Sequence, residues 1–130
     1  MKQEFNNIVD TLCERDQRYH PHSYEFVMEA LAYAQKKFQR QRHVSGLELL
    51  ESMKNLILEK FGPMALAVLK HWGIKSTEDF GHIVFNLVEN KVLSKAEEDS
   101  FEDFMRGWDF EEIFRKDYRR QLEKQVSRLR

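Results

Sequence analysis

The sequence predicts a mainly α-helical protein: a single-domain helical bundle of about six helices with at most a short two-stranded hairpin. Three observations favour this fold class. Apolar residues recur at helical spacing through most of the 130 residues, helix-capping patterns precede several of these stretches, and no run alternates apolar and polar residues over the length of a strand. Hydrophobic residues make up 42% of the chain, which is enough apolar material for one core.

Apolar stripes predict the first two helices. The first stripe covers residues 5–13 and ends near Arg15. Pro21 suits the first turn of the second helix, because a proline there loses no hydrogen bond, and the following stripe extends the helix to about Gln39.

The third and fourth helices are bounded by capping residues and glycines. The capping box Ser45–Glu48 starts the third helix, and Gly62 ends it. Pro63 opens a short fourth helix, Met64–Trp72, and Gly73 closes it. Because this helix is apolar on nearly all sides, we expect it to be central.

The second half of the chain contains two further capping boxes. Ser76–Asp79 starts a fifth helix whose apolar residues fit helical spacing without a miss, and Asp109–Glu112 starts a final helix. Residues 92–105 are open between strand and helix, because short apolar runs and capping residues both occur there.

The fourth and fifth helices, joined by a glycine-containing turn, would form a helix-turn-helix-like core with a small wing at Lys91–Ser94. The expected outward face of the fifth helix carries mainly acidic and neutral residues: Glu78, Asp79, His82, Asn86 and Glu89. Acidic side chains repel phosphates, so this face disfavours DNA binding.

Charge is unevenly distributed although the formal net charge is only −1. Residues 97–112 hold eight acidic residues and one basic residue, whereas residues 115–130 hold seven basic residues and two acidic ones. We therefore divide the chain into a helical domain, 1–114, and a basic helical C-terminal extension, 115–130.

Six short stretches carry a family resemblance, and most of them contain glycine, proline or tryptophan. They are Arg42–Leu50, Phe61–Ala65, Trp72–Ile74, Thr77–Gly81, Ile83–Glu89 and Trp108–Phe110. With these stretches, residues 5–114 resemble a small family of conserved hypothetical bacterial proteins, chiefly from planctomycete and verrucomicrobial lineages. Trp108 stands where that family more often has Tyr. The family has no assigned activity, so the resemblance implies one domain and no site residues.

Catalytic, cofactor-binding and metal-binding motifs are not predicted. The five glycines are scattered singly, which excludes a phosphate-binding loop. Cys13 lies on an apolar stripe and is expected in the core. His20 and His22 flank a proline turn, and His71 and His82 could meet near Asp79, but polar contacts explain both pairs without a metal.

The interpretation that we favour is a non-enzymatic protein-interaction or adaptor module, for which self-association through the C-terminal helix is one mode of interaction. Candidate contacts are the thin apolar stripe and its basic neighbours: Tyr118, Arg119, Arg120, Leu122 and Val126. The alternative is a nucleic-acid-associated protein that binds through this tail and a second basic group: Lys36, Lys37, Arg40, Arg42 and His43. A third interpretation is an enzyme with an unrecognised site around Arg42 and His43.

No apolar run reaches the length of a membrane span, and a single cysteine without a signal sequence indicates a cytoplasmic protein.

Overall fold

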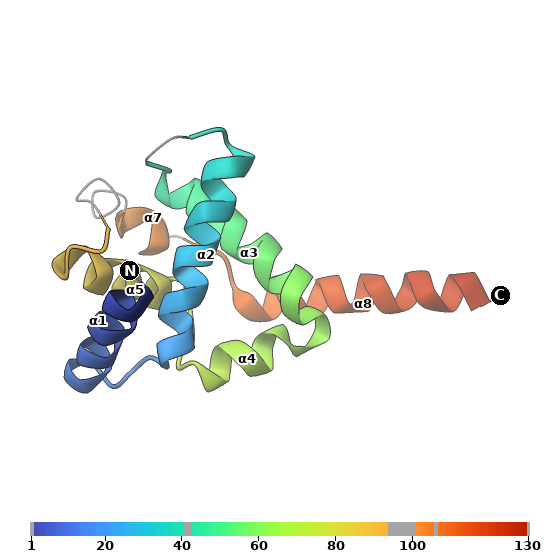
Figure 1. The fold of residues 1–130 in the computed structure, drawn as a ribbon. Helices are drawn as coiled ribbons and strands as arrows, with labels where there is room; N and C mark the ends of the chain where they lie inside the picture. The colour runs from blue at the N-terminus through green and yellow to red at the C-terminus, as the bar shows by residue number, and fades with distance from the viewer. Residues whose placement is uncertain (1, 41–42, 94–100, 106, 130) are drawn as a thin grey trace.

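The computed structural model describes residues 2–40, 43–93, 101–105 and 107–129. These residues form seven α-helices and one 3-10 turn (Figure 1). The elements are α1 (Lys2–Arg15), α2 (Pro21–Lys37), α3 (Gly46–Phe61), η1 (Gly62–Met64), α4 (Ala65–His71), α5 (Thr77–Glu89), α7 (Phe101–Met105) and α8 (Phe110–Leu129). The predicted all-helical fold is confirmed.

Local capping explains where the helices begin and end. At the start of α3, the Ser45 hydroxyl accepts the Glu48 amide proton at 3.0 Å, and the Glu48 carboxylate accepts the Ser45 amide proton at 2.9 Å. Gly62 ends α3 with a φ of +49°, and Gly73 follows α4 with a φ of +84°. Both values lie in the left-handed region that glycine adopts without steric cost.

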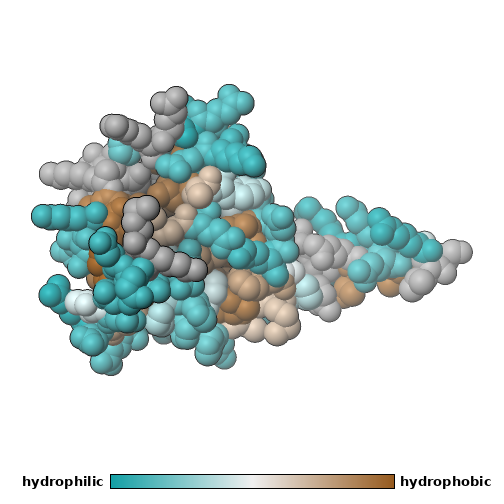
Figure 2. All heavy atoms as spheres, viewed as in Figure 1, coloured by the Kyte–Doolittle hydropathy of each residue, from teal (hydrophilic) through white to brown (hydrophobic). Residues whose placement is uncertain are grey.

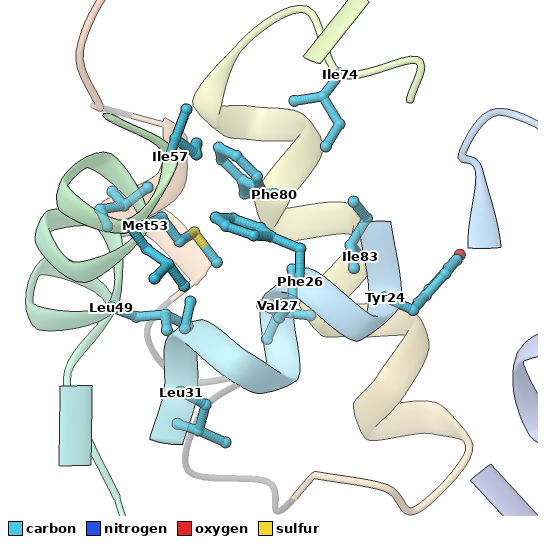
Figure 3. Packing of buried hydrophobic residues seen from close by; sticks show 14 of the residues in the cluster. Tyr24, Phe26, Val27, Leu31, Leu49, Met53, Ile57, Ile74, Phe80 and Ile83 are labelled. Atoms are coloured by element: carbon cyan, nitrogen blue, oxygen red, sulfur yellow. The ribbon is translucent and has the colours of Figure 1, made fainter. Parts of the chain in front are cut away.

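Helices α2, α3, α5 and α7 enclose the core (Figure 3). Phe26 of α2 lies 6.3 Å from the Phe80 ring of α5, and Met53 of α3 is fully buried beside them. Phe104 of α7 is also buried, so this five-residue helix contributes a large side chain to the core. Burial of aromatic and aliphatic side chains from four helices is the main stabilising contribution to this fold.

Helix α4 lies at the edge of the body, so the expectation that it is central was wrong (Figure 1). Only Ala65 and Leu69 of this helix are buried, and the preceding Met64 is 59% exposed. Helix α4 packs on α3 and on α8, and its residues Leu66 and Val68 are only partly buried against the core.

The sequence left residues 92–105 open between strand and helix, and the structure describes part of this region. Residues 101–105 form α7, the described residues 92 and 93 form no strand, and residues 94–100 lie outside the described part. None of the described residues is in a strand, so the short hairpin that the sequence allowed is not seen among them.

Helix α8 runs without interruption across the predicted division at residues 114 and 115. Its first turns contact α4 and η1, and its second half projects from the body (Figure 1). The division into a domain and an extension stays a prediction. Among the described helices, none combines the length and apolar character that crossing a membrane requires.

Candidate functional site

The start of α8 is fixed to the body by a cap and an aromatic cluster. The Asp109 carboxylate accepts the Glu112 amide proton at 2.9 Å, which is one of the two hydrogen bonds of the predicted capping box. Phe110 and Phe114 are buried, and their rings lie 5.2 and 5.5 Å from Trp108. These contacts hold the first two turns, so the direction of the whole helix is set by the body.

A groove lies between this anchored part of α8 and the turn that connects α3 to α4. Its volume is about 450 Å³. The lining residues are Gly62, Pro63, Leu66, Phe114, Arg115, Arg119 and Leu122. Leu122, at the end of the groove, is 41% exposed, and Val126, one turn further along α8, is 53% exposed. We call this surface, the groove together with Leu122 and Val126, the α8 face.

The α8 face carries hydrophobic residues among many charged ones. Figure 2 shows single hydrophobic residues along the lower edge of the projecting helix, surrounded by hydrophilic residues. Exposed aliphatic side chains on a projecting helix gain no burial in the monomer, so contact with another molecule would be favourable.

Charge changes sign along α8. Residues 109–112 hold three carboxylates and no base, whereas residues 119–128 hold four bases and one carboxylate. Two of the early carboxylates form ion pairs within the helix: Glu111 with Arg115 at 2.6 Å and Glu112 with Lys116 at 3.0 Å. The exposed second half therefore presents a net positive surface.

The two groups of predicted contact residues lie on different parts of the molecule. Lys36 and Lys37 are exposed at the end of α2, at the top of Figure 1, far from the projecting half of α8. Arg40 is paired with Glu48 at 3.1 Å, and His43 is exposed. Arg42 lies outside the described residues.

On α8 itself, the side chains of Arg119, Arg120, Leu122 and Val126 are exposed, and their role as contacts stays a prediction. Tyr118 is part of the helix, but its side chain lies outside the described part. The structure therefore brings Arg119 and Leu122 together at the groove, and it separates both of them from the basic end of α2.

A buried tyrosine connects the loop between α1 and α2 to helix α5. The Tyr19 hydroxyl donates to the Asp79 carboxylate at 2.6 Å, and its oxygen lies 3.0 Å from Nδ1 of His82. Burial, and then the hydrogen bond to Asp79, raise the pKa of Tyr19. Tyr19 therefore stays protonated and serves as a fixed donor.

A second set of contacts reinforces this connection. Arg18 donates to both carboxylate oxygens of Asp16, at 2.8 and 2.7 Å, and Asn86 of α5 donates to Asp16 at 3.1 Å. The hydrogen bond from Arg18 is the main reason that the pKa of Asp16 lies well below its ordinary value. The Asn86 amide also donates to the Tyr24 hydroxyl at 3.0 Å.

These contacts correct the predicted outward face of α5. Asp79, His82 and Asn86 were expected to face solvent, but the loop between α1 and α2 contacts all three. Helix α5 also packs mainly on α7 and α2. Its polar side therefore holds the fold together instead of presenting a surface to DNA.

The histidines pair differently from the prediction. The His71 ring lies 5.1 Å from the ring of His20, whereas Nδ1 of His82 lies 3.0 Å from the Tyr19 hydroxyl oxygen. The reason is that the end of α4 returns to the start of α2, where the His20 amide donates to the Trp72 carbonyl at 3.1 Å. In the described part of the chain, no group of three or more His, Cys, Asp or Glu residues is arranged to hold a metal ion.

Cys13 is partly buried, which agrees only in part with the predicted core position. Its thiol donates weakly to the Tyr19 carbonyl at 3.7 Å. Burial raises the pKa of the Cys13 thiol, and the nearby carboxylates of Asp10 and Asp16 raise it further. A thiol with a raised pKa is a poor nucleophile at neutral pH.

Comparison with known proteins identifies no relative: no family model, no curated protein and no solved structure matches the chain. The arguments for function therefore depend on the geometry of the α8 face and on the charges around it.

Proposed function

We propose that the protein is a non-enzymatic, cytoplasmic interaction module that associates with a second copy of itself through the α8 face. The observation that carries this proposal is the projecting half of α8, with Leu122 and Val126 exposed beside an apolar groove. We include the resemblance to a family of bacterial proteins in this proposal. Because that family has no assigned activity, the resemblance indicates no reaction and no ligand.

The dimensions of α8 suit pairing with another helix. Twenty residues correspond to roughly 30 Å of helix. Leu122 and Val126 are four residues apart and so lie on the same side of the helix, where both are exposed, whereas Phe114 is already buried against the body. A stripe of this width is too narrow to form a core alone, but it is buried when a second helix packs along it.

The charge pattern selects a second copy as the occupant. In an antiparallel pair, the basic half of each α8 lies beside the acidic first turn of the other. Because a two-fold axis relates the copies, this favourable juxtaposition occurs twice. Arg119 lines the groove and would contribute to it from each copy.

The cytoplasmic part of the proposal is supported by the single cysteine. Cys13 is a free thiol without a partner cysteine in the sequence, which suits a reducing compartment. The interaction itself does not depend on this point.

The test replaces the two exposed apolar residues of α8 with charges. We expect the wild-type protein to be a dimer by light scattering and sedimentation equilibrium, and the double variant Leu122→Glu, Val126→Glu to be monomeric. Each substitution occurs twice in a two-fold dimer, so the double variant places four carboxylates in the interface; at about tenfold each, association would weaken by about ten-thousandfold.

Ser127→Glu is the matched control, because Ser127 is exposed on the same helix but lies roughly 140° around it from Leu122. This variant should remain dimeric. A wild-type protein that is monomeric at all accessible concentrations would refute the proposal, as would a double variant that associates as strongly as the control.

A further inference from the structure

Three histidines meet where α2 begins and α4 ends. The His20 ring lies 4.8 Å from the His22 ring and 5.1 Å from the His71 ring. His20 is the N-cap of α2, and its Nδ1 accepts the His22 amide proton at 3.1 Å. The cap of this helix is therefore an imidazole nitrogen, where Ser, Thr, Asp or Asn is usual.

An imidazole cap works only in its neutral form. Protonation of His20 would replace the accepting lone pair on Nδ1 with an N–H group, so the hydrogen bond from the His22 amide would be lost. The resulting cation would also lie at the positive end of the helix dipole. A serine or asparagine cap has no such sensitivity near neutral pH.

The surroundings of His20 also oppose its protonation. His22 on α2 and His71 on α4 face it, so a positive charge on either ring opposes a charge on His20, whereas the Glu25 carboxylate acts in the opposite sense. Burial is the main cause that lowers the pKa of His20, and the two neighbouring histidines lower it further.

Backbone contacts connect this cap to α4. The His20 amide donates to the Trp72 carbonyl at 3.1 Å, and the Ser23 hydroxyl donates to the His20 carbonyl at 2.6 Å. A change in the position of His20 therefore affects both the first turn of α2 and the end of α4.

We propose that His20, His22 and His71 form a pH-sensitive switch that holds the first turn of α2 against the end of α4 at neutral pH and releases it on mild acidification. The direction of the pH effect follows from the thermodynamic linkage between proton binding and folding. A histidine with a lowered pKa in the folded state contributes its full stability above the ordinary value of about 6.5, and this contribution is lost as the pH falls below that value. The switch uses contacts outside the α8 face and does not depend on self-association.

The test measures hydrogen exchange of the His22, Ser23 and Tyr24 amides in the full chain at about pH 7.5 and about pH 5.5, expressed as protection factors so that the intrinsic pH dependence is removed. We expect protection to fall by about fivefold at the lower pH, the size of effect typical of losing one N-cap. His20→Asn should retain protection at both values, because asparagine caps a helix and does not titrate.

His43→Asn serves as the control, since His43 is an exposed histidine away from this cluster. It should leave the pH response of the three amides unchanged. The proposal is overturned if protection in the wild type is the same at both pH values, or if His20→Asn shows the same loss as the wild type.

Discussion

Gly73 lies where the connection between α4 and α5 passes against the loop between α1 and α2. Its φ of +84° is in the left-handed region. A Cβ atom placed there would collide with the backbone carbonyl oxygen of Arg18. The close approach allows the hydrogen bond between His20 and Trp72, so one residue without a side chain brings two loops together.

Gly73→Ala should therefore be strongly destabilising. We expect a loss of about 3 kcal/mol in the free energy of unfolding, measured by urea denaturation, because the left-handed backbone and the collision both oppose the methyl group. Gly62→Ala is the control: its φ is +49°, but a Cβ atom there meets nothing within 4 Å. That variant should lose less than Gly73→Ala, because only the backbone conformation and no collision opposes its methyl group. Equal losses would show that the loop contact has no stabilising effect.

The contacts of Tyr19 with Asp79 and His82 show which side-chain interactions the sequence could predict and which it could not. The capping role of Asp79 is local and was predictable from Ser76 three residues earlier. The partners Tyr19 and His82 are separated by 63 positions, and no local pattern joins them. The one available signal was a large aromatic residue, Tyr19, in a loop outside the predicted helices, where burial needs a distant partner.

At the scale of elements, the helices were predictable and their positions were not. Helical periodicity and capping boxes depend on residues three and four apart, so the bounds of α1, α3 and α5 agree closely with the prediction. Helix α4 was placed in the centre because its sequence is apolar on nearly all sides. Its true position at the edge depends on how η1 turns the chain after Gly62, which periodicity does not encode.

The first turns of α8 are anchored on the body, and its second half projects from it. Truncating the chain separates the contributions of these two parts. A chain that ends after Tyr118 should remain folded, because Phe110 and Phe114 keep the first turns on the body. We expect a loss of about 1 kcal/mol in unfolding free energy from removing the half-exposed Leu122, together with a change from dimer to monomer. Thermal denaturation and light scattering measure the two effects. An unchanged oligomeric state would place the association surface elsewhere.

At the scale of the whole molecule, the charge distribution argues against nucleic-acid binding. The basic end of α2 and the basic half of α8 lie apart in Figure 1, and Arg40 is already paired with Glu48. A backbone contact with nucleic acid needs several bases along one continuous surface. The sequence could show both basic groups, but only the fold shows that they are separate.

Fluorescence anisotropy with duplex and single-stranded probes at low salt tests this conclusion. We expect no saturable binding, because low salt maximises phosphate contacts and the separated basic groups still cannot act together. Binding that is tight at low salt and falls steeply as salt is added would favour the nucleic-acid alternative. The double charge reversal Arg119→Glu, Arg120→Glu would then show whether α8 is responsible.

The projecting half of α8 has a consequence for the thermodynamics of assembly. Helices shorter than roughly 12 to 15 residues are only marginally stable in water when nothing packs against them. The exposed turns beyond Phe114 depend on their own backbone hydrogen bonds, because few body contacts support them. A second helix packed along these turns would supply that support, so part of the binding energy would offset the conformational entropy of ordering them. Folding of the last turns and association of the two copies would then form one coupled equilibrium.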